Sequence, residues 1–189
     1  MEGIMQPLFS NGLCLRPFED RDAAPFALAA RESIATVGRW MPWCHSEYSP
    51  VQAREWFALC AQGFADKSAF EFGVFAADGT ELLGGAGLNQ FNKQHNFCNL
   101  GYWVRESKQR QAVATRVVRI LSEFGFTELA LTRIEIVVAE GNEPSNGVAR
   151  NAGARFEGFA RNRILINGSP IGASVYSLVP NPVPEGSGT

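Results

Sequence analysis

An amphipathic segment flanked by two apolar runs constrains the fold of this chain more than any other feature. Within "AVATRVVRILSEFGF", residues 112–126, apolar side chains recur at the spacing of one face of an α-helix. These side chains are Val113, Val117, Ile120, Leu121, Phe124 and Phe126. The run before the segment, "FCNLGYWVR", and the run after it, "RIEIVVA", are typical of strands. A helix placed between strands in this way indicates an α/β protein.

The remaining elements follow from turn and periodicity signals. The predicted first strand spans residues 13–18, and the two predicted helices after it span residues 19–32 and 51–64. Asp78-Gly79 and Asn167-Gly168 are the turn pairs of two β-hairpins, and Gly153 is placed to end a short helix. The predicted order is strand, two helices, three strands, helix, strand, helix and two strands. This order gives about seven strands and about four helices.

Length and composition predict one globular domain. A chain of 189 residues with 46% hydrophobic side chains can bury one sizeable core, but it is short for two comfortable domains. We assign the domain to residues 11–179 and an N-terminal extension to residues 1–10. Residues 180–189 are rich in proline and glycine, which predicts a disordered tail.

Charge and cysteine content narrow the partners and the compartment. The 17 basic and 19 acidic residues are evenly mixed, so the sequence predicts no basic face for nucleic acid. No apolar run approaches the roughly 18 residues of a membrane span. The four cysteines lie far apart without a CxxC pair, namely Cys14, Cys44, Cys60 and Cys98. These patterns predict a cytoplasmic protein that binds neither nucleic acid nor membrane, and they leave a homodimer open.

The start of the amphipathic helix predicts an anion site. The first backbone N–H groups of a helix lack internal partners and attract anions, above all phosphate. Ser107 could cap this helix, but the turn from Lys108 to Gln111 is basic or amide-bearing rather than acidic. The backbone donors are then open to an external phosphate. Because basic residues at a helix start are also common on solvated faces, both readings stay open.

Four segments resemble the GNAT superfamily of N-acetyltransferases, in particular the Rim-type branch that acetylates protein N-terminal amines. "LGYWVRESKQRQAVAT" resembles the family's strand, turn and pyrophosphate-binding helix start, and "RIEIVVAEGNEPSNGVARNAGARFEG" resembles the next strand and helix of the branch. "GRWMPW" is similar to its tryptophan loop, and "INGSPIGASVYSL" to its closing hairpin. The resemblance extends from about Leu13 to Val179 and implies a twisted mixed sheet.

The resemblance also implies an activity and a set of site residues. The activity is transfer of an acetyl group from acetyl-CoA, as cosubstrate, to a primary amine, either a protein or peptide N-terminal α-amine or a small-molecule amine. The residues implied for acetyl-CoA binding are Tyr102, Trp103, Val104, Gln109, Arg110, Gln111, Ala112, Val113, Ala114, Thr115 and Asn142. Those implied for the acceptor pocket are Trp40, Trp43 and Tyr48. Ser145 is implied as the proton donor to the leaving thiolate.

Other readings of these residues stay open at this point, and the chain departs from the family pattern in two respects. Taken alone, Ser145 could cap its helix, Asn142 could be a turn residue, and the aromatic residues could belong to the core. Arg110 and Ala112 occupy positions where the family has glycine, which lets a backbone approach phosphate closely. The branch also places a carboxylate before the closing hairpin turn, where this chain has Ile164.

A general base has to come from elsewhere if that carboxylate is missing. Glu71, Glu135, Glu157 and His95 are available, none at a diagnostic position, and we carry Glu135 forward with Ser145 as the predicted catalytic residues. An N-terminal amine with a pKa of roughly 7.7 to 8.0 is partly neutral at pH 7, whereas lysine near 10.4 is not. A site without a strong base therefore favours an α-amine or another weakly basic amine.

Two alternatives remain beside the transferase. A degenerate module that binds CoA or a partner without catalysis would explain the lost glycines and the missing carboxylate. A zinc site would need Cys44-His45 and His95-x-x-Cys98 to meet, but the separation of these pairs fits no recognised pattern. We therefore predict no metal site.

Overall fold

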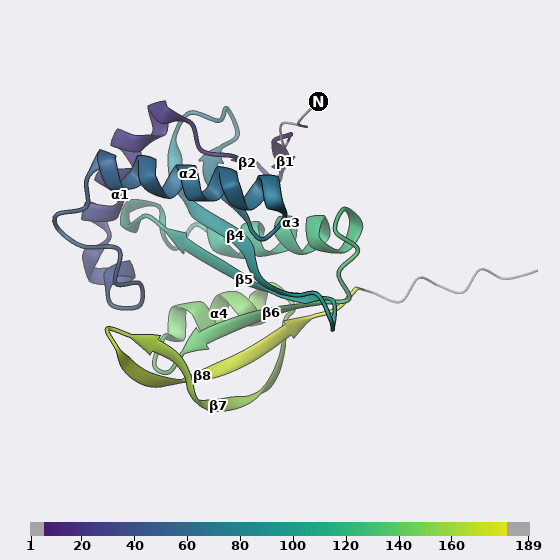
Figure 1. Cartoon of the computed structure of the whole chain (residues 1–189). Helices are drawn as coiled ribbons and strands as arrows, with labels where there is room; N and C mark the ends of the chain where they lie inside the picture. The colour runs from purple at the N-terminus through teal and green to yellow at the C-terminus, as the bar shows by residue number, and fades with distance from the viewer. Residues whose placement is uncertain (1–5, 181–189) are drawn as a thin grey trace, which may run out of the picture.

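One mixed sheet with helices on both faces forms the computed structural model, which describes residues 6–180 (Figure 1). The strands are β1 (Leu8–Ser10), β2 (Leu13–Arg16), β3 (Phe70–Ala76), β4 (Leu82–Asn92), β5 (Phe97–Val104), β6 (Arg133–Ala139), β7 (Arg155–Ile166) and β8 (Ser169–Leu178). The α-helices are α1 (Ala23–Glu32), α2 (Pro50–Asp66), α3 (Val113–Thr127) and α4 (Glu143–Asn151). Short helical turns lie at Asp20–Asp22, Ile34–Gly38 and Glu106–Lys108. The α/β prediction is confirmed.

The strand order explains where the sheet can open. The sheet runs β1-β2-β3-β4-β5-β6-β8-β7, and within it only β5 and β6 are parallel. These two strands pair from Phe97 to Asn99 on the β5 side, after which β5 continues to Val104 in register with β4 alone. The second half of β5 therefore has a free edge toward β6.

The sheet has one strand more than the sequence predicted. β1 lies within residues assigned to the N-terminal extension and pairs with β2 across a tight turn at Asn11 and Gly12, whose φ angles are 51° and 73°. Asparagine and glycine are the residues that adopt positive φ most readily, so the pair closes a hairpin. The predicted tail, residues 180–189, lies outside the described residues except for Pro180.

The turn predictions are confirmed where the backbone needs positive φ. Gly79 has a φ of 73° between β3 and β4, and Asn167 and Gly168 have φ angles of 49° and 77° between β7 and β8. Gly153, with a φ of 91°, follows the end of α4, where its N–H bonds to the carbonyl of Arg150.

The predicted start of the amphipathic helix was wrong. Glu106–Lys108 forms a separate short turn, and α3 begins only at Val113. Arg110 and Ala112 have φ angles of 59° and 55°, and left-handed residues cannot continue a right-handed helix. The segment that looked like a first helical turn is therefore a loop in front of the helix.

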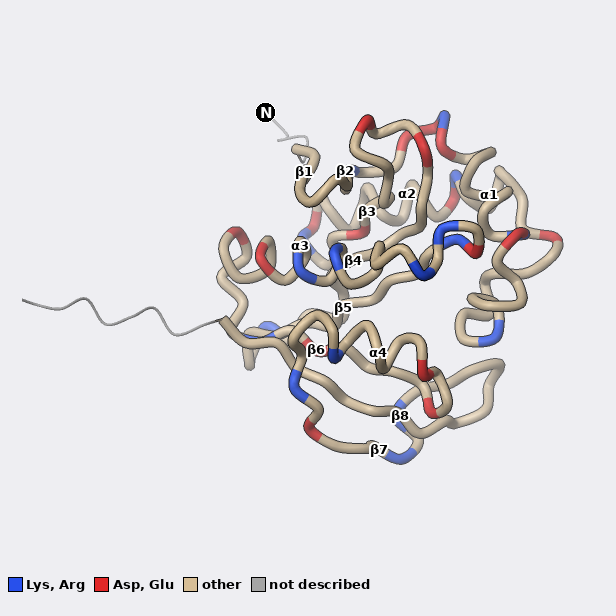
Figure 2. Tube along the Cα trace, turned by 180° about the vertical axis from the view of Figure 1, so that it is seen from behind, with Lys and Arg blue, Asp and Glu red and all other residues tan. Residues whose placement is uncertain are grey.

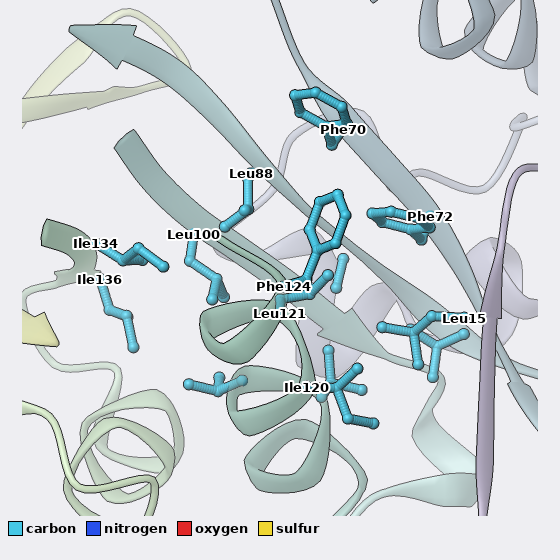
Figure 3. Close-up of a cluster of buried hydrophobic side chains, with 14 of the residues drawn as sticks. Leu15, Phe70, Phe72, Leu88, Leu100, Ile120, Leu121, Phe124, Ile134 and Ile136 are labelled. Carbon is cyan, nitrogen blue, oxygen red and sulfur yellow. The ribbon is translucent and has the colours of Figure 1, made fainter. Parts of the chain in front are cut away.

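Two apolar clusters hold the helices on the sheet. On one face, Ile120, Leu121 and Phe124 of α3 belong to a cluster with strand residues such as Leu88 and Leu100 (Figure 3). The Phe124 ring lies 5.7 Å from that of Phe70. On the other face, α1 and α2 pack against Phe75, Leu82 and Trp103; the buried helix residues of that cluster are Ala23, Phe26, Ala27, Ala29, Ala30, Ala53 and Phe57. The small alanines let α1 approach the sheet closely.

The charged residues are dispersed along the trace. Positions of Lys and Arg and positions of Asp and Glu are both scattered over the trace, without one large region of a single sign (Figure 2). Several of these residues form ion pairs, such as Arg105 with Glu32. No helix within residues 6–180 combines the length and apolar character that crossing a membrane requires.

Candidate active site

The free edge of β5 borders a long cleft of about 810 Å³. Its walls come from the second half of β5, from residues 136–139 of β6, from residues 108–110 and 112–115 of the loop and helix start, and from α4. Residues 35–37 and 39–41, in and after the turn that follows α1, close one end. The sheet thus splays where two parallel strands stop pairing, and this splay makes the cleft.

The loop before α3 has the backbone of a phosphate cradle although it has no glycine. Arg110 and Ala112 both adopt the left-handed conformation, which glycine adopts most readily. Ala112 is the N-cap residue of α3, no side chain caps the helix, and its first turn carries no acid. The N–H groups of Val113, Ala114 and Thr115 therefore point toward the cleft end of the helix without a side-chain acceptor, which suits a pyrophosphate.

Contacts with α1 fix the position of this loop. The Glu32 carboxylate pairs with Arg105 and accepts the backbone N–H of Ser107 at 2.8 Å. The hydrogen bond from Arg105 lowers the pKa of Glu32 to about 2. The Gln109 side chain donates to Thr36 Oγ1 and to the carbonyl of Val104, both at 3.0 Å. These hydrogen bonds connect the loop to the end of β5 and to the turn after α1.

Lys108 is less available to an anion than the sequence suggested. Its Nζ lies 2.6 Å from Glu81 Oε1, so its charge is balanced within the protein. Arg110 has no ion pair among the described residues and lines the cleft. Of the two predicted cationic neighbours, Arg110 is the one whose charge is free for a phosphate.

Ser145 and Asn142 sit at the start of α4, and the structure separates their roles. Asn142 is the N-cap: its Oδ1 accepts the backbone N–H of Ser145 at 3.2 Å. The Ser145 hydroxyl is therefore not a cap, and it lies 2.8 Å from the hydroxyl of Tyr102 on β5. Burial raises the pKa of Tyr102 to about 12, so this pair of hydroxyls is neutral and protonated at neutral pH.

A second cavity of about 370 Å³ lies on the other side of β5. Trp43 and Tyr48, two of the predicted acceptor residues, line it, and the Trp43 ring lies 5.3 Å from that of Trp103. Trp40, the third, lines the long cleft instead. Both cavities share Gly101, Tyr102 and Trp103 with Met41, so they meet at the splayed strand.

Glu71 on β3 is the carboxylate that the second cavity contains. Its Oε1 accepts the side-chain amide of Asn89 at 2.8 Å, and Asn89 Oδ1 accepts that of Asn99 at 3.0 Å. Burial raises the pKa of Glu71. The sequence named Glu71 only as one of several candidates, because nothing local showed that it would point into a cavity.

The structure does not bring Glu135 to either cavity. Its carboxylate lies 2.9 Å from Arg133 and 3.8 Å from Arg163, on the sheet beside Glu157. Glu157 is itself paired with Arg133 and accepts the hydroxyl of Ser177 at 2.6 Å. These carboxylates are held by arginines, so the catalytic role predicted for Glu135 has no geometric support. The other candidate, His95, lies in the exposed loop between β4 and β5, outside both cavity linings.

Comparison with known proteins identifies the family. The acetyltransferase (GNAT) domain family matches residues 12–155. N-acetyltransferase YoaA of Bacillus subtilis, itself uncharacterized, is 31% identical over 91% of this chain and 96% of its own. Spermidine N(1)-acetyltransferase of Escherichia coli K12 is 29% identical over 84% of this chain and 81% of its own.

Solved structures agree with this assignment. A provisionally named ribosomal-protein-serine acetyltransferase from Vibrio cholerae superposes with a TM-score of 0.84 at 31% identity, over 94% of this chain and 99% of its own. RimL, a ribosomal L7/L12 α-N-protein acetyltransferase solved with coenzyme A, shares the fold with a TM-score of 0.82 at 19% identity, over 92% of this chain and 98% of its own. The chain therefore belongs to the GNAT family of acetyltransferases, in its Rim-type branch.

Proposed function

We propose that this chain transfers an acetyl group from acetyl-CoA to a primary amine, either the N-terminal α-amine of a protein or peptide or a small-molecule amine. The observation that carries the proposal is the meeting of two cavities at Gly101, Tyr102 and Trp103. One is a long cleft with an uncapped helix start at its end, and the other is an aromatic cavity with one carboxylate. A thioester and an amine could approach β5 from opposite faces of the sheet.

The cleft fits acetyl-CoA on three counts. The left-handed residues Arg110 and Ala112 turn the loop so that the donors at the start of α3 are available to a pyrophosphate. The free edge of β5 up to Val104 can accept an extended pantetheine arm as an added strand. The neighbouring structures of RimL with CoA and of microcin C7 self-immunity acetyltransferase with acetyl-CoA support this assignment.

The residues at the junction divide the chemistry between the two faces. When bound, acetyl-CoA supplies the activated acetyl group and a thiolate leaving group. On the cleft face, the hydroxyls of Ser145 and Tyr102 hold protons that can be given to a thiolate. In this proposal, backbone N–H groups on the free edge of β5 near Tyr102 stabilise the negative charge on the carbonyl oxygen. On the other face, the aromatic cavity holds the amine away from water.

The rival proposal, a binding module without catalysis, was suggested by the replaced glycines and the missing carboxylate. Each of these departures has a counterpart in the structure. The loop keeps its left-handed turns with Arg110 and Ala112 in place of glycine. The position of the missing carboxylate, Ile164, lines the cleft, but Glu71 supplies a carboxylate from β3 in the other cavity.

The four cysteines are buried and unpaired, which supports the cytoplasm as the proposed compartment.

Release of free thiol from acetyl-CoA tests the proposal. The purified chain is incubated with acetyl-CoA and a panel: seryl and alanyl peptide amides, the same peptides with blocked N-termini, benzylamine, spermidine and Nα-acetyl-lysine. We expect turnover on at least one free α-amine or small amine and none on the blocked peptides. Thiol release at the background rate with every amine would contradict the proposed transferase.

A further inference from the structure

Glycines on β4 let the side chain of Glu71 lie flat across the sheet. Glu71 is paired with Gly87 on β4, and Gly87 with Gly101 on β5, so the three residues form one row across the strands. A methyl group at Gly87 would overlap Glu71 Oε2, which shows that the carboxylate lies over this glycine. Since neighbouring strands lie about 4.8 Å apart, the carboxylate extends toward β5, where the two cavities meet.

The surroundings of Glu71 make it an isolated negative charge. Among the residues that line the aromatic cavity, Glu71 is the only charged one, and no described cation lies within ion-pair distance of it. Asn89 donates to Oε1, and no described residue donates to Oε2. Cys60 of α2 lies close enough to Glu71 to feel its charge, and Tyr48 and Tyr102 line the same cavity. Burial raises the pKa of all three groups, so all three are neutral at neutral pH. A partly buried carboxylate without a cation of its own is suited to a cationic ligand.

We propose that Glu71 binds the ammonium group of the acceptor and takes its proton before acetyl transfer. This inference rests on the proposed function and assigns the base for it. One N–H bond of the ammonium breaks, its electron pair stays on nitrogen, and the proton passes to a carboxylate oxygen of Glu71. The neutral amine then faces Gly101 and Tyr102, and the proton on Glu71 leaves to water when product departs. The raised pKa of Glu71 brings it closer to that of an α-amine, which makes the transfer less uphill.

The same cavity restricts the class of acceptor. Around the carboxylate the lining consists mainly of aromatic side chains, among them Phe18, Phe26, Trp43 and Trp56. Burying a second charge against these rings without a partner would be unfavourable. The acceptor is therefore an amine with a single positive charge near the reacting nitrogen and a small or apolar neighbour group, rather than a polyamine.

Two measurements on Glu71→Gln test the inference. In the first, side-chain carboxyl NMR of the free protein follows the titration of the glutamates. We expect one glutamate with a pKa above the ordinary value of roughly 4.3, and its resonance should vanish in Glu71→Gln. In the second, kcat/KM is measured against pH with acetyl-CoA and the amine panel named above. Glu71→Gln should lower kcat/KM by roughly 10² to 10⁴-fold and abolish the acidic limb of the profile.

Two further variants keep the result interpretable. Glu123→Gln makes the same exchange on the exposed face of α3 and should leave both measurements unchanged. Asn89→Ala removes the hydrogen bond that favours the charged carboxylate, so it should move the glutamate pKa and the acidic limb to higher pH even if Glu71→Gln folds poorly.

The outcomes separate this inference from the proposed function. If the wild-type chain acetylates a panel amine and Glu71→Gln does so equally well, the base assignment falls and the transferase stands. An acidic limb that Asn89→Ala does not move also overturns it, as does a spermidine rate above that of every single-charge amine. If the wild-type chain acetylates nothing, the proposed function falls and the base assignment falls with it.

Discussion

The hydroxyl groups of Tyr102 on β5 and Ser145 on α4 lie 2.8 Å apart across the cleft. Tyr102 also donates to the backbone carbonyl of Ser145 at 3.3 Å, so the strand and the helix are tied at one point. This contact places two proton-bearing oxygens beside the free edge of β5. A serine that gives its proton to the thiolate can take one from the Tyr102 hydroxyl, and Tyr102 is then reprotonated by water, so the pair can act as one unit.

Ser145→Ala should lower kcat by a factor of about 10 to 10⁴ while CoA affinity stays nearly constant. The variant lacks the hydroxyl that donates a proton to the thiolate, and this donation comes late in the reaction, after CoA has bound. Steady-state kinetics and CoA calorimetry measure these two quantities. Since Asn142 rather than Ser145 caps α4, the melting temperature should change little. Full turnover combined with a lower melting temperature would contradict the acid role.

Tyr102→Phe tests whether the two hydroxyls act together. We expect a smaller loss of kcat than for Ser145→Ala, because the serine can still donate once. In the double variant the losses should be less than additive, as for residues that act as a unit. Independent losses, measured as a double-mutant cycle on kcat, would show that Tyr102 only positions α4.

Asn142→Ala should affect both stability and CoA binding. Loss of the cap at Ser145 N–H costs about 1 kcal/mol of unfolding free energy. The Asn142 amide nitrogen has no hydrogen-bond donor role toward any described residue, so it is free to contact CoA, and CoA affinity should fall more than kcat. Asn142→Asp is the control that keeps the cap. Restored stability with weak CoA binding in this control would separate the two roles, and unchanged CoA affinity in both variants would contradict the contact.

The sequence predicted the fold well because its signals are local. Strand alternation, helical spacing and the positive-φ turns at Gly79 and Gly168 each act within a few residues. The missed elements were β1, three residues long, and the true start of α3, where Arg110 and Ala112 adopt a conformation that their side chains disfavour. Nothing in a linear pattern reports such strain, because the loop is held by Glu32 of α1 from outside and by the side chain of Gln109 within it.

The sequence could not single out a carboxylate as the base, for a different reason. Glu71 and Glu135 both lie on strands among apolar neighbours and look alike in sequence. What distinguishes them is the partner across the sheet, because Glu71 lies over Gly87 whereas Glu135 lies beside Arg133. Pairing between strands is a long-range property, so the glycine-rich run "LLGGAG" of β4 gains its meaning only once the register is known.

Ala112→Gly should stabilise the protein by up to about 1 kcal/mol, because an L-residue in the left-handed region is strained and glycine is not. CoA affinity should be retained or improved. Ala112→Asp keeps a short side chain but brings a carboxylate to the helix start, so CoA affinity should fall well below that of the glycine variant. Thermal unfolding and calorimetry provide the two readouts, and equal CoA affinity in both variants would contradict the phosphate cradle.

Acid should loosen the loop before α3 through Glu32. Its pKa in the folded state, about 2, lies below the ordinary value of 4.5, so the charged carboxylate is more stable in the folded state than in the unfolded state. The stability from this group is therefore complete above about pH 5 and is lost as the pH falls from 4.5 toward 2. Glu32→Gln should be less stable than wild type at pH 7, and the gap should close over that range. Denaturant unfolding at several pH values measures it, with the exposed Glu123→Gln as control, and a gap that is as large at pH 2.5 as at pH 7 would show that Glu32 acts by packing rather than by its charge.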